Sequence, residues 1–254
     1  GRRFDWVNIP LADVKAVKNK LGGTVNDVFL ASVAGAVRRF LIEDRGSSEK
    51  DLEGTDFRVM APVSVRSKDQ RGTLGNQVAM WLAALPIDDD DAASRLRKVH
   101  AETEKLKDTD QALGAATLVR VSAGAPATLV ALGARLAANA RPFNMTVTNV
   151  PGPQFPLYLL DARVEATYPL VPLWESHGIG LAMFSYDGTV SWGINADYGI
   201  MPDVDRFGQA ILDSFAELCE AASNAPEPPE KPAKPKAASK LEKPAPKKRP
   251  PIGT

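Results

Sequence analysis

Histidine is the side chain best suited to acid–base catalysis near neutral pH, and this chain of 254 residues has two, His100 and His177. His100 lies in a charged helical segment, and we expect it on a solvated helix face. His177 directly precedes a predicted strand, where it could face a ligand, but a hydrogen bond to a backbone carbonyl is the favoured alternative. Cys219 is the single cysteine, so a disulfide within the chain and a cysteine-based metal site are both excluded.

Other catalytic signatures are absent from the sequence. There is no nucleophile elbow, no glycine-rich phosphate loop and no His-Glu-x-x-His motif. We therefore predict no catalytic residue in this chain, no metal site and no cofactor.

The segments that would position a site alternate between helical and extended patterns. Apolar spacing predicts helices over residues 11–21, 24–41, 92–106 and 203–222, and two helices divided by Pro126 within residues 112–140. It predicts strands over residues 57–65, 76–85, 145–150, 163–168, 178–186 and 189–197, with a polar loop over residues 46–56. Pro62 favours an edge or a bulge in the first of these strands. Asp187-Gly188 predicts a hairpin, so we expect an α/β fold with a mixed sheet.

The helix predicted after residue 24 has the clearest start. Thr24 is a good N-cap, and Asp27 completes a capping-box pattern three residues later. We expect Asp27 to serve its own helix in this way. Asn26, between them, either secures the preceding loop or donates its amide toward a cleft.

Composition divides the chain near residue 224. Apolar residues make up 44% and charged residues 24%, enough for a globular core, and the net charge is zero. Residues 224–254 hold nine of the 20 prolines, and their seven Lys and one Arg against three Glu give +5, which leaves −5 for residues 1–223. We predict one domain over residues 1–223 and a disordered tail over residues 224–254.

The longest charge-free helical run, residues 121–134, is shorter than the roughly 20 residues that span a bilayer. The first residues contain no apolar signal core, and we expect a processed, truncated or fragmentary chain.

Three segments resemble one enzyme family. They are Thr-Val-Asn-Asp-Val at residues 24–28, Asn-Met-Thr-Val-Thr-Asn-Val-Pro-Gly-Pro at 144–153 and Tyr-Pro-Leu-Val-Pro-Leu-Trp-Glu-Ser-His-Gly-Ile-Gly-Leu at 168–181. In this order and spacing they resemble the C-terminal half of bacterial wax ester synthase/diacylglycerol acyltransferases. The resemblance covers residues 1–222. It implies a mixed-sheet half of the fold of chloramphenicol acetyltransferase and of condensation domains.

The resemblance also implies a reaction. The complete enzymes transfer a fatty acyl group from acyl-CoA, a substrate, to diacylglycerol or to a long-chain alcohol. Their His-His-x-x-x-Asp-Gly motif lies in the N-terminal half, which is missing here, so the chain alone is expected to be inactive and to need that half as a partner.

The resemblance further implies residues that line a substrate tunnel. These are Asn26, Arg66, Asn76, Asn149, Gly152, Trp174, Ser176, His177 and Gly178, while Thr24, Asp27, Pro151 and Pro153 would be structural. Arg66 is a candidate cation for a CoA phosphate, with an ordinary surface arginine as the alternative. The apolar segment 170–174 and the glycines 178 and 180 could form a tunnel wall, or could pack the two halves together.

Two other interpretations stay open. One is a non-catalytic module with the same fold that binds lipid or pairs with an intact homologue, and a weaker one is the condensation-domain branch. We expect a cytoplasmic protein, or one held peripherally at the inner membrane or at lipid droplets through its basic tail. The tail lacks aromatic residues, which argues against nucleic-acid binding.

Overall fold

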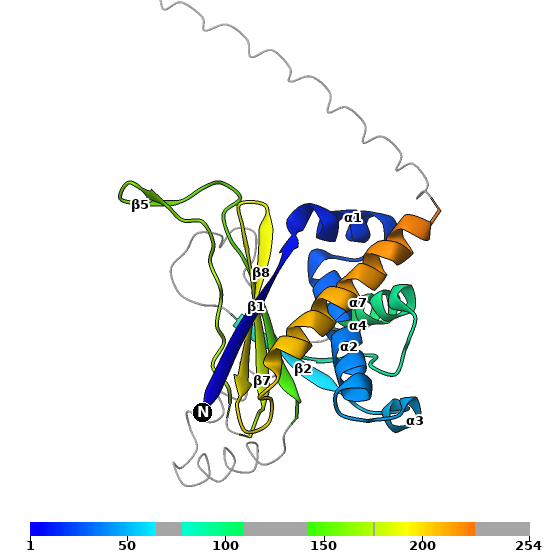
Figure 1. Ribbon diagram of the computed structural model, residues 1–254. Coiled ribbons are helices and arrows are strands. Elements are labelled where there is room, and N and C mark those ends of the chain that lie inside the picture. Colours follow the sequence, from blue (N-terminus) through cyan, green and yellow to red (C-terminus); the bar gives the residue numbers. More distant parts are fainter. Residues whose placement is uncertain (65–77, 109–141, 175, 227–254) are drawn as a thin grey trace, which may run out of the picture.

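The computed structural model describes residues 1–64, 78–108, 142–174 and 176–226. Within them, one mixed sheet is covered on one face by a layer of helices (Figure 1). The predictions for residues 65–77, 109–141 and 227–254, including Arg66, Asn76 and most of the basic tail, lie outside the described part of the chain.

The sheet has six strands in the order β1-β8-β7-β4-β2-β3. Their bounds are β1 Arg2–Pro10, β2 Arg58–Ser64, β3 Val78–Ala84, β4 Met145–Pro151, β7 Ile179–Tyr186 and β8 Thr189–Asp197. Strand β4 runs parallel to β2 and to β7, whereas β1–β8, β7–β8 and β2–β3 are antiparallel. The prediction of a mixed sheet is therefore confirmed.

The turn between β7 and β8 shows why that hairpin was predictable. Asp187 has φ 43° and Gly188 has φ 84°. A two-residue hairpin of this twist needs two successive left-handed residues, which Asp-Gly supplies at low cost. Ile179 then pairs with Ala196, and Tyr186 pairs with Thr189.

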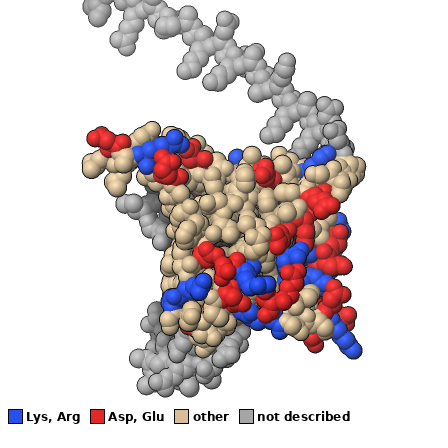
Figure 2. All heavy atoms as spheres, viewed as in Figure 1, with Lys and Arg blue, Asp and Glu red and all other residues tan. Residues whose placement is uncertain are grey.

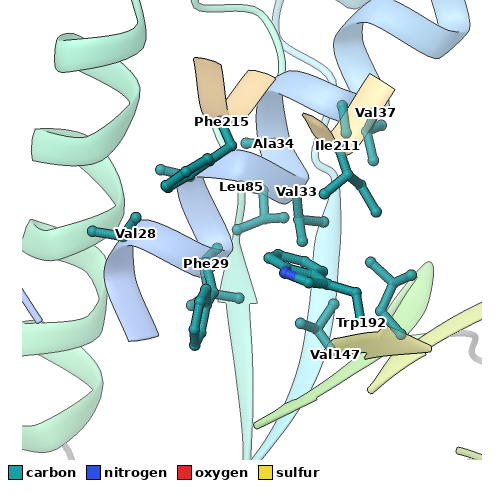
Figure 3. Close-up of a cluster of buried hydrophobic side chains, with 14 of the residues drawn as sticks. Val28, Phe29, Val33, Ala34, Val37, Leu85, Val147, Trp192, Ile211 and Phe215 are labelled. Atoms are coloured by element: carbon teal, nitrogen blue, oxygen red, sulfur yellow. The ribbon is translucent and has the colours of Figure 1, made fainter. Parts of the chain in front are cut away.

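The helices that cover the sheet are α1 Leu11–Leu21, α2 Val25–Glu43, α4 Ala92–Asp108 and α7 Val204–Asn224. Helix α2 begins with the predicted capping box: the Asp27 amide donates to Thr24 Oγ1, and the Thr24 amide donates to Asp27 Oδ2 at 2.8 Å. The core lies between α2, α7 and the sheet. There Phe29 meets the buried Trp192 edge-on, with 5.4 Å between ring centroids (Figure 3).

Three sequence predictions are wrong in detail. Strand β2 is internal rather than an edge, but its ladder with β4 contains only Val59 and Met60, so Pro62 lies beyond it. The polar loop contains a one-turn helix, α3 Glu49–Leu52, because Ser48 and Asp51 form a second capping box.

The third error concerns residues 163–168, predicted as a strand. Only β6 Ala162–Arg163 is extended in a ladder, paired with β5 Tyr158–Leu159 in a separate small hairpin. Beyond it the backbone is held by single contacts and not by a ladder: the Val164 backbone amide donates to the Leu157 carbonyl at 2.9 Å, and the Tyr186 hydroxyl donates to the Val164 carbonyl at 2.9 Å. An alternating pattern predicts an extended backbone but does not show whether it has a neighbour to pair with.

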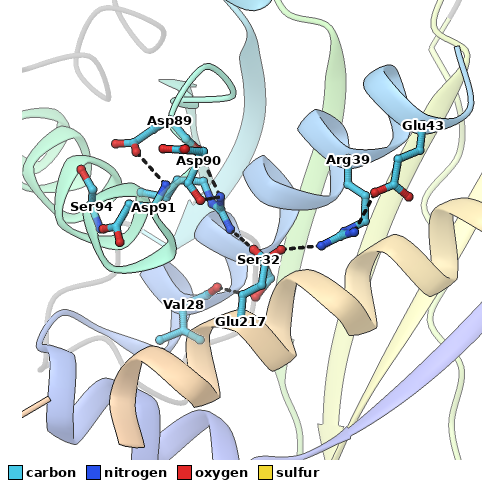
Figure 4. Close-up of polar contacts among 10 residues, drawn as sticks. Val28, Ser32, Arg39, Glu43, Asp89, Asp90, Asp91, Ser94 and Glu217 are labelled. Carbon is cyan, nitrogen blue, oxygen red and sulfur yellow. Dashed lines mark hydrogen bonds and ion pairs between the residues drawn. The ribbon is translucent and has the colours of Figure 1, made fainter. Parts of the chain in front are cut away.

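A buried arginine joins three helices. Arg95 on α4 has a side chain only 2% exposed, and its guanidinium donates to the carbonyl oxygens of Asp89 and Asp90 and to the carboxylate of Glu217 on α7. Arg39 on α2 donates to the other oxygen of Glu217 at 2.5 Å and to Glu43 (Figure 4). Glu217 is therefore the shared anion that links α2, α4 and α7.

Arg45 forms a bidentate ion pair with Asp203, the residue that precedes α7. Arg45 donates two parallel hydrogen bonds to Asp203, at 2.7 and 2.9 Å, and lies 4.3 Å from the centroid of the Phe40 ring. The hydrogen bonds from Arg45 lower the pKa of Asp203 from 3.8 to about 2. This contribution to stability is thus present above pH 3.8 and is lost as the pH falls through about 2.

We expect Asp203→Asn to reduce the free energy of unfolding by about 1 kcal/mol at pH 7, because a partly exposed bidentate pair is screened by water. The difference from the parent protein should begin to fall below pH 3.8 and should vanish only below pH 2, where Asp203 is protonated in the folded state as well. Urea unfolding at pH 7 and at about pH 1, roughly one unit below the folded-state pKa, measures it, with Asp161→Asn, at the exposed β5–β6 turn, as the control. A difference that persists at the lower pH would refute the assignment.

Within the described residues, no helix has the length and apolarity needed to cross a membrane. Acidic and basic side chains gather over the helical layer of the molecule (Figure 2). Most of the large exposed apolar side chains lie instead on the sheet, on the β5–β6 hairpin and on the segment that follows it.

Candidate functional site

A cavity of about 640 Å³ lies at one end of the sheet. The start of β1, the end of β8 and the turn before β7 meet there, because Arg2 pairs with Asp197 and the Asp197 amide donates to the Gly178 carbonyl at 2.8 Å. The residues that line it are Arg2, Leu173, Trp174, Ser176, His177, Asp197 and Ile200. Three sequence-predicted site residues, Trp174, Ser176 and His177, are thus brought together.

One wall of the cavity is apolar and open to solvent. Trp174 is 54% exposed and Ile200 is 60% exposed, and Leu173 lies beside them. The predicted close approach at Gly178 is present: a Cβ there would lie 3.2 Å from Ile200 Cγ2. Gly178 therefore allows the Ile200 side chain to lie against the backbone.

The polar side of the cavity is formed by a tight turn. The His177 amide donates to the Trp174 carbonyl at 3.1 Å, and Ser176 has φ 66°. A non-glycine residue in this left-handed region is uncommon and costs about 1 kcal/mol or more, and such residues gather at functional sites. The turn holds Ser176 and His177 next to the apolar wall.

His177 makes the carbonyl contact predicted for it. Its Nε2 lies 3.1 Å from the Phe143 carbonyl oxygen, and its ring stacks on Phe143 with 4.3 Å between centroids. These contacts fasten the turn to the residues that precede β4. They favour a structural role for His177 over proton transfer.

Arg2 and Asp197, the arginine and the carboxylate among the described residues that line the cavity, form an ion pair. Arg2 donates to Asp197 Oδ2 at 2.5 Å. Neither residue was predicted, because the sequence separates them by 195 positions and only the β1–β8 ladder places them together.

Asn149 and Gly152 do not line this cavity. Asn149 pairs with Met183, five residues along β7 from Gly178, or roughly 16 Å at the usual rise per residue. At Gly152 a Cβ would lie 2.4 Å from the Ser185 carbonyl oxygen, and the Pro153 carbonyl accepts from the Asp187 amide at 3.1 Å. The turn between Pro151 and Pro153 is therefore packed against the β7–β8 hairpin, consistent with the predicted structural role of the prolines.

The segment of residues 168–173 crosses the sheet face that the helices leave open. A Cβ at Gly193 would lie 1.7 Å from the Pro169 carbonyl oxygen, and one at Gly180 would lie 2.9 Å from Val171 Cγ1. The side-chain amide of Asn195 donates through Nδ2 to the Val171 carbonyl at 2.9 Å. Both glycines therefore admit this segment, and the close approach at Gly180 is made within this chain. Gly193 was not singled out, although a glycine inside a strand signals such an approach.

The prediction for His100 is wrong. Its ring is part-exposed, but Nδ1 lies 2.9 Å from Oδ2 of Asp27, whose side chain is 1% exposed. The Thr103 hydroxyl donates to the other Asp27 oxygen at 2.7 Å. Asp27 therefore caps α2, as predicted, and also fastens it to α4.

Asn26 lies half-buried at the same helix start, and none of the cavity-lining residues named above is on α2. Within the described ranges no group of His, Cys, Asp and Glu has the arrangement of a metal site.

Comparisons with known proteins identify the family of the chain. A family model described as the WS/DGAT C-terminal domain matches residues 74–219. The probable diacylglycerol O-acyltransferase tgs1 of Mycobacterium tuberculosis is 33% identical over 219 residues, which cover 85% of this chain and 46% of that protein. The chain thus spans about half the length of the curated relatives it matches.

Solved structures match over the same extent. The wax ester synthase/diacylglycerol acyltransferase from Marinobacter aquaeolei VT8 has a TM-score of 0.65 at 28% identity, covering 87% of this chain and 49% of that one. A structure of condensation domain-mediated chain release from the enacyloxin polyketide synthase has a TM-score of 0.53 at 12% identity, covering 91% and 43%. The second likeness shows the fold alone, and together they confirm the predicted fold class.

Proposed function

The chain belongs to the family of WS/DGAT C-terminal domains, and from this premise we propose that it is one half of an O-acyltransferase. The complete enzyme would transfer a fatty acyl group from acyl-CoA to diacylglycerol or to a long-chain alcohol. The observation that carries the proposal is the family match over residues 74–219, together with relatives named as diacylglycerol O-acyltransferases of which the chain covers about half.

The chemistry needs a general base that the described residues do not offer. In the transfer, the acceptor hydroxyl gives up its proton to a base as its oxygen attacks the thioester carbonyl, and CoA leaves as the thiol. His177 is held against a carbonyl and His100 against a buried carboxylate. We therefore propose that a partner half carries the His-His-x-x-x-Asp-Gly motif and supplies the base, with acyl-CoA as a substrate and no further cofactor.

The described part of this chain would supply binding surface. The cavity beside Trp174 has the size of a small-molecule site, with an apolar wall and few polar groups. The β5–β6 hairpin and the residues just before it carry exposed apolar side chains, among them Phe155, Leu159 and Leu160. These side chains are suited to a partner half, or to peripheral contact with a membrane or lipid droplet, the location we propose for the complete enzyme.

Reconstitution tests the proposed activity. We expect no transfer from labelled palmitoyl-CoA to dioleoylglycerol or hexadecanol by this chain alone. Addition of the first half of a full-length relative should raise the rate about 10²-fold or more, the usual contribution of a general base. The control is the same half with its motif histidines changed to alanine.

The other outcomes are equally informative. Transfer by the chain alone would contradict the absence of a catalytic centre and make His177→Ala the next variant. No transfer in either case, with the halves shown to associate, would favour the non-catalytic lipid-binding or pairing module.

A further inference from the structure

We infer that the cavity beside Trp174 binds an uncharged long-chain molecule with a hydroxyl head, the chemistry of the acyl acceptor, rather than the CoA portion of the donor. The identification of this molecule as the acyl acceptor rests on the proposed function, whereas its binding to the cavity does not. The inference depends on the apolar wall, the charges and the free hydroxyl of the cavity.

The apolar wall matches an alkyl chain. Trp174 and Ile200 are both more than half exposed and flank the same cavity, with Leu173 beside them. Adjacent large apolar side chains left open to water mark a binding surface more often than scattered ones do. Each CH₂ group buried against them would strengthen binding about fourfold.

The charges of the cavity disfavour CoA. Its phosphates need cations that are free to donate, as arginine and lysine do in phosphate sites. Among the described lining residues the one cation is Arg2, and it already donates to Asp197 at 2.5 Å. The described lining residues therefore offer CoA no unpaired arginine or lysine, and this suits an uncharged ligand better.

The polar group best placed for a hydroxyl head is Ser176. It lines the cavity from its left-handed turn, and within the described part of the chain its hydroxyl has no hydrogen-bond partner. A serine hydroxyl can donate to and accept from an alcohol oxygen at once. A head group at Ser176 would leave the alkyl chain against Trp174 and Ile200.

Quenching of tryptophan fluorescence by bromoundecanol tests the inference on the 254-residue chain itself. We expect saturable quenching, most of which disappears in Trp174→Phe but not in Trp6→Phe, a substitution of the exposed tryptophan of β1. Decanol and dioctanoylglycerol should displace the probe, and CoA should not. Displacement by decanoyl-CoA as strong as by decanol would reassign the cavity to the acyl chain of the donor and overturn the inference.

A matched pair of variants locates the site. Ile200→Glu should weaken bromoundecanol binding about tenfold or more, because the alkyl chain would have to bury a carboxylate. Leu170→Glu is the control, since Leu170 is also 60% exposed but does not line the cavity. Equal affinities of the two variants, or quenching that survives Trp174→Phe, would overturn the inference.

The binding assay needs neither a partner half nor turnover, so its failure is distinguishable from failure of the proposed function. Binding without reconstituted transfer would support the binding site and contradict the proposed acyltransferase function. Transfer without binding at this cavity would support the acyltransferase function and overturn the inferred acceptor site.

Discussion

Glu217→Gln is expected to lower the free energy of unfolding by about 3 kcal/mol, because it leaves the buried guanidinium of Arg95 without its anion. The backbone carbonyls of Asp89 and Asp90 would still accept from Arg95, but they carry no net charge. Arg39 loses the same partner and keeps Glu43. In a domain of this size the melting temperature should fall by about 6–12 °C.

The control for this variant is Glu220→Gln, one turn farther along α7 and exposed. Surface substitutions of this kind usually stay within about 0.5 kcal/mol, so the two variants should differ clearly in urea unfolding. If Glu217→Gln proves as mild as the control, water reaches Arg95 in solution and the ion pairs do not hold α2, α4 and α7 together.

The parts of the fold that the sequence predicts well have local causes. Thr24 and Asp27 begin α2 from within one helical turn, and Asp187 and Gly188 close the β7–β8 hairpin by themselves. The capping box spans four consecutive residues and the hairpin turn two, and each contains the whole signal. The structure has these elements where the pattern places them.

The parts that could not be predicted depend on strand order. Arg2 and Asp197 meet because β1 lies at the edge beside β8, and nothing near either residue in the sequence encodes that neighbour. The error at His100 has a related cause, the packing of two helices, because its partner Asp27 lies 73 residues away on α2. The candidate cavity was therefore only half-predicted: the Trp174 turn was identified, and the charged pair opposite it was not.

Asp27→Ala should cost about 2–3 kcal/mol of unfolding free energy, whereas Asn26→Ala should leave stability within about 0.5 kcal/mol. The first variant removes the N-cap partner of Thr24 and the acceptor of His100 and Thr103 at one buried position. Thr103 keeps a bond to the His100 carbonyl, which limits the loss. Asn26 is half-buried and has no comparable set of contacts among the described residues.

Asn26→Ala and Asp27→Ala also distinguish a structural role of Asn26 from a catalytic one in the reconstituted enzyme. If the Asn26 amide donates to the developing oxyanion, Asn26→Ala should lower kcat by about 10²-fold at unchanged stability, the usual cost of one such donor. If it only secures the loop before α2, kcat and KM should both match the parent protein. Asp27→Ala, assayed below its melting temperature, should lose activity only in proportion to the folded fraction. A loss of kcat in fully folded Asp27→Ala would instead show that the α2–α4 contact through His100 positions Asn26, which would make the buried carboxylate part of the catalytic arrangement.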